Sequence, residues 1–134
     1  MKDNLTIIQE SYACGEKGDM PGLLKDLKPD GKWTEMAGNV YAGTYTGCDE
    51  ILKNVFARIG GEWKSFAAIP REFLDAGDKV IVLGNYVGVH LKTDRSMDIR
   101  YTHVWTLKDG KIENFEQFTD TAILRWAADE PYSE

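Results

Sequence analysis

The chain has 134 residues, of which 43% are hydrophobic and 28% are charged, and its formal net charge is −6. This length suits a single domain over residues 1–134 and is too short for two ordinary domains. The 16 Lys and Arg residues are scattered along the chain, which argues against a nucleic-acid partner or a polybasic membrane patch.

The sequence shows no targeting signal and no metal-binding pattern. Its N-terminal residues lack the apolar core of a signal peptide, and no segment approaches the roughly 20 apolar residues of a membrane span. We therefore expect a cytoplasmic protein with no membrane partner. Cys14 and Cys48 lie far apart without a Cys-x-x-Cys spacing, so we expect two ordinary thiols rather than a zinc site or a disulfide.

The first part of the chain is predicted to form two helices and a short strand. Apolar residues at helical spacing predict a helix over residues 4–17. Asp19 can cap a short second helix that carries Leu27 and stops before Pro29. After an Asp-Gly turn, residues 32–36 are predicted to form a short strand.

A glycine-rich loop and a long helix follow. Residues 37–47 contain too many flexible positions for regular structure, so we expect a loop. Asp49 is predicted to begin a helix that continues through Ile59 and is stopped by Gly60-Gly61.

The rest of the chain is predicted to be mostly strand and to complete an α+β fold. Pro70 places the first of these strands at a sheet edge or at a bulge. Short connections imply a mostly antiparallel, strongly curved sheet with the helices on one face, enclosing a pocket at its open end. The predicted elements are strands over residues 63–75, 79–91, 97–107 and 112–119 and a helix over residues 121–128.

His103 lies in the strand over residues 97–107, on the face formed by its apolar odd-numbered neighbours. A lone His on such a face is more often a hydrogen-bonded core residue than a reactive one. Glu35 shares a strand face with Trp33, and a poorly hydrated pocket there would raise its pKa and suit it to act as a base. The alternative for Glu35 is a solvent-facing side chain.

Three further residues are candidates with equally ordinary alternatives. Asp120 lies where the last strand ends, so it can belong to a site or cap the final helix. Tyr12 and Tyr45 can donate phenolic hydrogen bonds, or they can simply pack.

The order of these elements resembles the nuclear transport factor 2-like superfamily over residues 4–128. Within it the chain is most similar to the SnoaL-like polyketide cyclase and ketosteroid isomerase-related branch. The resemblance implies a cone-shaped sheet wrapped around helices, a deep pocket and a homodimer. It rests on the loop closed by Gly43-x-x-x-Gly47 and on Asp109-Gly110-Lys111-Ile112 followed by Phe115, Gln117 and Asp120-Thr121.

The resemblance also implies roles for individual residues. Glu35 matches the carboxylate base of steroid isomerases, and His103 falls where those enzymes place an acid that hydrogen-bonds the enolate. Tyr12 lies within a residue of their tyrosine on the first helix, and Asp120 matches the acid/base aspartate of SnoaL-like cyclases. A Glu and a His in place of two aspartates argue against steroid isomerase activity itself. Residues 82–86 offer no Arg-x-Asp pair, which argues against epoxide hydrolysis.

The resulting hypothesis is proton abstraction next to a carbonyl in a small hydrophobic ligand, by an isomerase or aldol-type cyclase that needs no metal or redox cofactor. Asp120 or Glu35 would be the base, and His103, helped by Tyr12 or Tyr45, would stabilise the enolate. The competing hypothesis is a non-catalytic ligand-binding or dimerisation module. The two differ in whether Glu35, His103 and Asp120 point into one cavity. The residues expected to wall the pocket are Trp33, Phe66, Tyr101 and Trp105.

Overall fold

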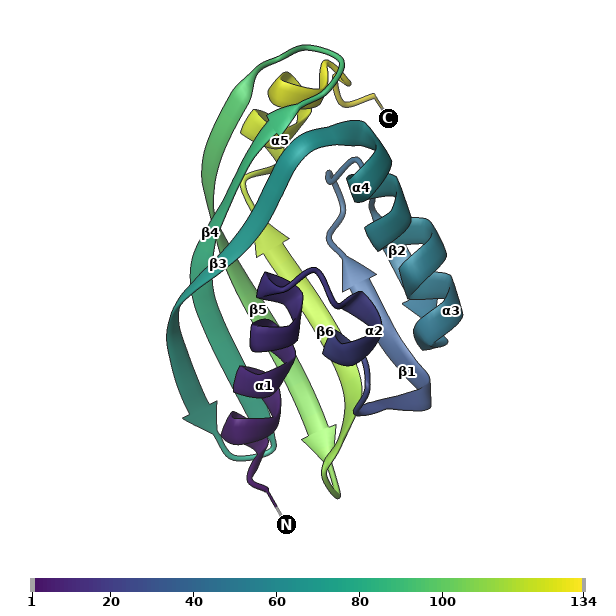
Figure 1. Cartoon of the computed structure of the whole chain (residues 1–134), viewed down its shortest axis with the longest axis vertical. Helices are drawn as coiled ribbons and strands as arrows, with labels where there is room; N and C mark the ends of the chain where they lie inside the picture. Colours follow the sequence, from purple (N-terminus) through teal and green to yellow (C-terminus); the bar gives the residue numbers. More distant parts are fainter. Residues whose placement is uncertain (1, 134) are drawn as a thin grey trace.

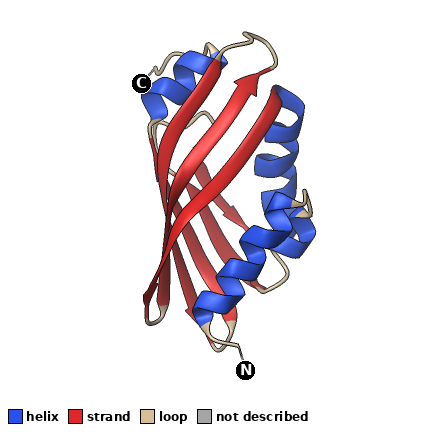
Figure 2. Ribbon diagram, turned by 60° about the vertical axis from the view of Figure 1, so that its left-hand side comes forward, coloured by secondary structure: helices blue, strands red, loops and turns tan. Residues whose placement is uncertain are grey.

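The fold is a six-stranded, strongly twisted sheet that curves around helices packed on one of its faces (Figures 1 and 2). It was obtained as a computed structural model, which describes residues 2–133. The elements are α1 (Asn4–Glu16), α2 (Met20–Leu23), β1 (Leu27–Glu35), β2 (Gly43–Thr46), α3 (Gly47–Ile51), the π-helical turn η1 (Leu52–Phe56), α4 (Ala57–Glu62), β3 (Trp63–Ala76), β4 (Lys79–His90), β5 (Ser96–Lys108), β6 (Lys111–Thr119) and α5 (Thr121–Ala128).

The strand order is β2-β1-β6-β5-β4-β3, and every neighbouring pair is antiparallel except β1 with β6, which is parallel. The expected α+β class with a mostly antiparallel, curved sheet is therefore confirmed. Figure 2 shows α1 and the helical run from α3 to α4 lying along the same side of the sheet. The space between the sheet and these helices is where the site lies.

Alternation along the strands builds the inner wall of this space. In β5 every odd-numbered side chain from position 97 to 107 is buried, while the even-numbered ones are more exposed. The predicted inward face of this strand is thus confirmed. Helix α1 covers that wall with Ile7, Ile8 and Tyr12, all buried. Asp3 caps this helix by accepting a hydrogen bond from the Thr6 N–H at 2.8 Å.

Two boundaries near the N-terminus differ from those predicted. The second helix ends at Leu23, and Leu27 belongs to β1, where it pairs with Ile112 of β6. Residues 37–47 are not all loop, because the segment Gly43–Thr46 forms β2 on the edge of β1. Both errors have the same cause: backbone hydrogen bonds to strands distant in sequence override local propensity.

The long central helix also differs at both ends. It begins at Gly47 rather than at Asp49, and Gly60-Gly61 does not stop it, because α4 continues to Glu62. A Cβ atom at either glycine would lie in open space, so packing does not require glycine at these two helical positions. The chain leaves the helix at Trp63, whose backbone is extended.

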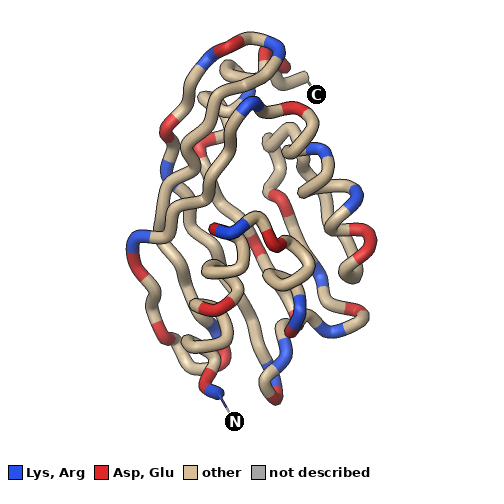
Figure 3. The backbone as a smooth tube through the Cα atoms, viewed as in Figure 1, with Lys and Arg blue, Asp and Glu red and all other residues tan. Residues whose placement is uncertain are grey.

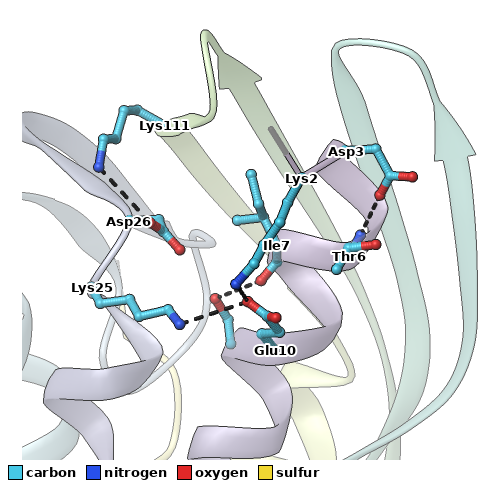
Figure 4. Close-up of polar contacts among 9 residues, drawn as sticks. Lys2, Asp3, Thr6, Ile7, Glu10, Lys25, Asp26 and Lys111 are labelled. Atoms are coloured by element: carbon cyan, nitrogen blue, oxygen red, sulfur yellow. Dashed lines mark hydrogen bonds and ion pairs between the residues drawn. The ribbon is translucent and has the colours of Figure 1, made fainter.

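Positively and negatively charged residues are interspersed along the described backbone (Figure 3). Some of them link α1 to the segment that follows it (Figure 4). Lys2 and Lys25 both pair with Glu10, at 2.9 and 3.6 Å. These pairs are exposed, so each contributes little to stability. Within residues 2–133 no helix is both long and apolar enough to cross a membrane.

Gly84 provides a test of the packing between β3, β4 and β5. A Cβ at this position would lie 2.3 Å from the Ile69 carbonyl oxygen and 2.4 Å from the Tyr101 hydroxyl. We expect Gly84→Ala to lower the free energy of unfolding by about 1–3 kcal/mol, as measured by urea denaturation. Gly60→Ala is the matched control and should be neutral or stabilise by up to about 1 kcal/mol. Equal stability of Gly84→Ala and the parent protein would contradict this packing.

Candidate functional site

A cavity of about 590 Å³ lies between the concave face of the sheet and the helices. The more exposed of its lining residues are mostly apolar and come from the end of α1, α2, the π-helical turn, α4 and β3. The deeper part is lined by buried side chains from the central strands. Polar groups are concentrated there, in Tyr12, Glu35, Asn39, Tyr86, His103 and Gln117.

An apolar row of aromatic side chains crosses the sheet at the base of the cavity. Trp33 of β1 pairs with Phe115 of β6, which in turn pairs with Trp105 of β5. The rings of Trp33 and Phe115 stack with centroids 3.8 Å apart, and Phe56 of the π-helical turn meets Trp33 edge-on. These contacts fix the orientation of the row, so the residues next along each strand are also held in place.

A polar row lies beside the aromatic one. Gln117 pairs with His103 across β6 and β5. Glu35 and Gln117 each lie two residues beyond the Trp33–Phe115 pair on parallel strands, so they share the inward face. Three polar side chains therefore stand in one line across β1, β6 and β5.

His103 is the centre of a buried hydrogen-bond network. Its Nδ1 atom is 2.5 Å from the Tyr12 hydroxyl, and its Nε2 atom is 2.6 Å from the Tyr86 hydroxyl. The Tyr101 ring stacks on the imidazole, with centroids 3.9 Å apart. Burial lowers the pKa of His103 to about 3, so the ring is neutral at physiological pH. Burial also raises the pKa of the Tyr12 and Tyr86 hydroxyls, which keeps them protonated.

Further donors hold the two tyrosines. The Trp105 indole N–H donates to the Tyr12 oxygen at 2.9 Å, and the Gln117 amide donates to the Tyr86 oxygen at 2.8 Å. The Asn39 amide donates to the Gln117 Oε1 atom at 2.7 Å, which fixes the orientation of that amide. The network thus links α1, the β1–β2 connection and three strands.

Among residues 2–133, Glu35 is the one carboxyl in the deep part of the cavity, and it is only 4% exposed. Burial raises its pKa from 4.5 to about 8, and the neighbouring Trp33 and Gln117 side chains offset this only in part. The Trp33 indole N–H is itself buried without a hydrogen-bond partner of good geometry. Glu35 is therefore largely protonated at neutral pH, and it can exchange a proton within the ordinary pH range.

The structure brings together most of the residues predicted from sequence. Asp120, however, does not converge with Glu35 and His103: it is exposed and accepts a hydrogen bond from the Ile123 N–H at 3.0 Å, as the N-cap of α5. The helix-capping alternative thus accounts for Asp120. The predicted residues that line the cavity are Tyr12, Trp33, Glu35, Phe66, His103 and Trp105.

Tyr45 and Tyr101 do not line the cavity either. The Tyr45 hydroxyl donates to the Tyr41 carbonyl oxygen at 2.7 Å, which holds the β1–β2 connection in place. Tyr101 is on the inward face of β5, but its ring lies behind His103 and its hydroxyl lies against Gly84, buried without a partner. Both residues therefore support the site from outside.

Sequence reasoning missed Tyr86, Asn39 and Gln117 as members of the site. Tyr86 lies on the buried face of β4, where burial alternates along the strand. Gln117 lies two residues after Phe115 on the buried face of β6, and a polar residue in that position is a usable signal. Asn39 lies in the glycine-rich segment, where no pattern marks it.

The model of the SnoaL-like domain family matches residues 8–115. The chain belongs to the SnoaL-like family. No protein of curated function matches this SnoaL-like chain.

Solved structures share the fold of the SnoaL-like chain. An NTF2-like protein from Burkholderia thailandensis E264 is 42% identical, with a TM-score of 0.92 over 98% of this chain and 100% of that one. An NTF2-like protein of unknown function from Burkholderia pseudomallei K96243 is 29% identical, with a TM-score of 0.87 over 96% and 98%. TerC, co-crystallised with polyporic acid, is 29% identical, with a TM-score of 0.84 over 94% and 98%.

The raised pKa of Glu35 predicts a specific dependence of stability on pH. A carboxyl with a folded-state pKa of about 8 stabilises the fold below pH 4.5, and this contribution is lost as the pH rises through 8. Glu35→Gln removes the ionisation. We expect its free energy of unfolding, relative to the parent protein, to rise by several kcal/mol between pH 5 and pH 9. If urea titrations give the same difference in free energy of unfolding between Glu35→Gln and the parent protein at both pH values, the pKa of Glu35 is not raised.

Proposed function

We propose that this SnoaL-like protein is a small-molecule enzyme that moves a proton next to a carbonyl group in a hydrophobic substrate, without a cofactor, as an isomerase or an aldol-type cyclase. One observation carries the proposal. A carboxyl with a pKa of about 8, Glu35, lines the same cavity as a neutral histidine held between two tyrosine hydroxyls. The first group suits proton abstraction, and the second suits stabilisation of an enolate.

Glu35 is the base in this proposal. Its ionised form takes the proton from the carbon next to the carbonyl: the C–H bond breaks, an O–H bond forms on the carboxyl, and the electron pair moves to the carbonyl oxygen. The proton can then return to a different carbon. Alternatively, the enolate carbon forms a bond to a second carbonyl carbon, whose C=O π bond opens, and the resulting alkoxide oxygen takes the proton from the carboxyl. A base whose pKa lies near the working pH is both available and strong enough for this step.

The hydroxyl of Tyr12 or of Tyr86 is the group that donates to the enolate oxygen. Both ring nitrogens of His103 are engaged by these hydroxyls, so His103 acts as a positioning residue rather than as the donor itself. The donating hydroxyl is held in place before substrate binds, which is what makes such a group effective in a dry cavity.

The cavity supports a substrate built on one or two rings. Its volume is about 590 Å³, and the aromatic row of Trp33, Phe115 and Trp105 supplies apolar ring surface to its lining. The relative TerC was co-crystallised with polyporic acid, a ring-containing compound, which supports a ring-containing ligand here.

The proposal is tested with 2-tetralone, a bicyclic ketone whose hydrogens next to the carbonyl exchange with solvent. We expect the protein to accelerate exchange into D2O, measured by 1H NMR, and the rate to rise with pH towards a plateau above about pH 8. Glu35→Gln should lower the rate at least about 100-fold, since this is the usual contribution of a general base.

Asp120→Asn is the matched control, because asparagine also caps helices and the fold should be unaffected. Its exchange rate should equal that of the parent protein. Loss of exchange in Asp120→Asn alone would move the base to Asp120. Tight binding of 2-tetralone without exchange would instead favour a non-catalytic ligand-binding module.

A further inference from the structure

The hydrogen bonds around His103 leave one hydroxyl proton without a partner inside the network. A neutral imidazole carries one N–H, and each of Tyr12 and Tyr86 carries one O–H. These three protons serve only two contacts, one on each ring nitrogen. One proton must therefore point elsewhere, and both tyrosines line the cavity.

Two arrangements satisfy this count. In the first, Tyr12 donates to Nδ1, the Nε2–H donates to the Tyr86 oxygen, and the Tyr86 proton is free. In the second, Tyr86 donates to Nε2, the Nδ1–H donates to the Tyr12 oxygen, and the Tyr12 proton is free. The tautomer of His103 decides between the two arrangements, because it determines which tyrosine donates to the ring.

The surrounding donors do not absorb the free proton. The Trp105 indole N–H can only donate, and it donates to the Tyr12 oxygen. The Gln117 amide is held with its NH2 group towards Tyr86, because its oxygen accepts from Asn39. Asn39 is held in turn, because its Oδ1 atom accepts the Tyr41 N–H at 2.9 Å. The amide orientations are therefore set from the backbone outward.

The lone pairs complete the count. In the first arrangement the Tyr86 oxygen accepts from His103 and from Gln117, so both its lone pairs are used and it can only donate to the cavity. The Tyr12 oxygen accepts only from Trp105, so one lone pair is open. In the second arrangement the roles of the two tyrosines are exchanged. Either way one hydroxyl proton and one hydroxyl lone pair remain unused on the two tyrosines, both of which line the cavity.

We propose that the ligand of this cavity is a hydroxy ketone, whose carbonyl oxygen accepts from one tyrosine while its hydroxyl donates to the other. This names the substrate class of the proposed function and rests on it. The carbonyl at the donating tyrosine is the one that becomes the enolate. In a ligand whose only polar atoms are carbonyl oxygens, a carbonyl lone pair would face the open lone pair of the accepting tyrosine, and the two would repel each other. Because the His103 tautomer can change, either tyrosine can take either role.

The four 2-tetralones with a hydroxyl at position 5, 6, 7 or 8 test this inference, since they place the hydroxyl at different distances from the carbonyl. Dissociation constants can be measured by quenching of tryptophan fluorescence, because Trp33 and Trp105 line the cavity. We expect at least one isomer to bind about tenfold more tightly than both its methyl ether and unsubstituted 2-tetralone. If no isomer shows this preference in the parent protein, the inference is wrong.

Variants identify the source of the preference. Tyr12→Phe and Tyr86→Phe each leave one tyrosine hydroxyl, which can bind the ligand's carbonyl but not its hydroxyl as well. The preference for the hydroxylated ligand should therefore fall to about twofold or less. Tyr45→Phe is the matched control, because that hydroxyl is bound to a backbone carbonyl outside the cavity, and it should retain the full preference. Should one cavity variant fail to fold, the other carries the comparison. A preference that survives in a folded cavity variant would overturn the assignment.

The proposed function can fail separately. Hydroxyl preference is a binding measurement and does not depend on ionised Glu35, whereas exchange of 2-tetralone does. Preference without exchange would leave the ligand class standing and remove the enzyme. Exchange of 2-tetralone without a hydroxyl preference would leave the proposed enzyme standing and remove the hydroxy ketone as its ligand class.

Discussion

The site depends on the burial of a neutral imidazole between two phenolic hydroxyls. A buried histidine needs a partner on each ring nitrogen, because an unpaired polar group in an apolar interior is costly. His103 finds these partners on two different elements, Tyr12 of α1 and Tyr86 of β4. Meeting this requirement ties α1 to the sheet through Tyr12, in addition to the buried apolar side chains of Ile7 and Ile8.

The pKa values of His103 and Glu35 in the deep part of the cavity are shifted in opposite directions by the same cause. Burial lowers the pKa of His103 to about 3 and raises that of Glu35 to about 8. At neutral pH the deep part of the cavity therefore carries little charge, which suits an apolar ligand. A charge appears there only when Glu35 ionises, so the chemistry that the site can perform is tied to a single carboxyl.

Much of the fold could be predicted from local pattern, whereas the site could be predicted only in part. The alternation of β5 placed His103, Tyr101 and Trp105 on one buried face, and that face is observed. Glu35 was predicted as a site residue because it shares a strand face with Trp33. For Asp120, the sequence could not distinguish a site residue from a helix cap, and only the position of α5 in the structure decides between them. The partners of His103 depend on the register of β4 and β6 against β5, which strand pattern does not encode. Tyr86 and Gln117 were missed for that reason, and β2 was missed because its pairing with β1 overrides a glycine-rich sequence.

The central claim is that His103 remains neutral and shares its one proton between two tyrosines. It is tested most directly by the 15N chemical shifts of the imidazole in protein labelled at histidine, followed between pH 5.5 and 9, with a His90 variant to assign the two histidines. The account predicts a neutral ring throughout, with the two nitrogens together carrying one proton, and no titration in this range. A His103 ring that titrates near its ordinary pKa of about 6.5, with both nitrogens protonated at the acidic end, would contradict it.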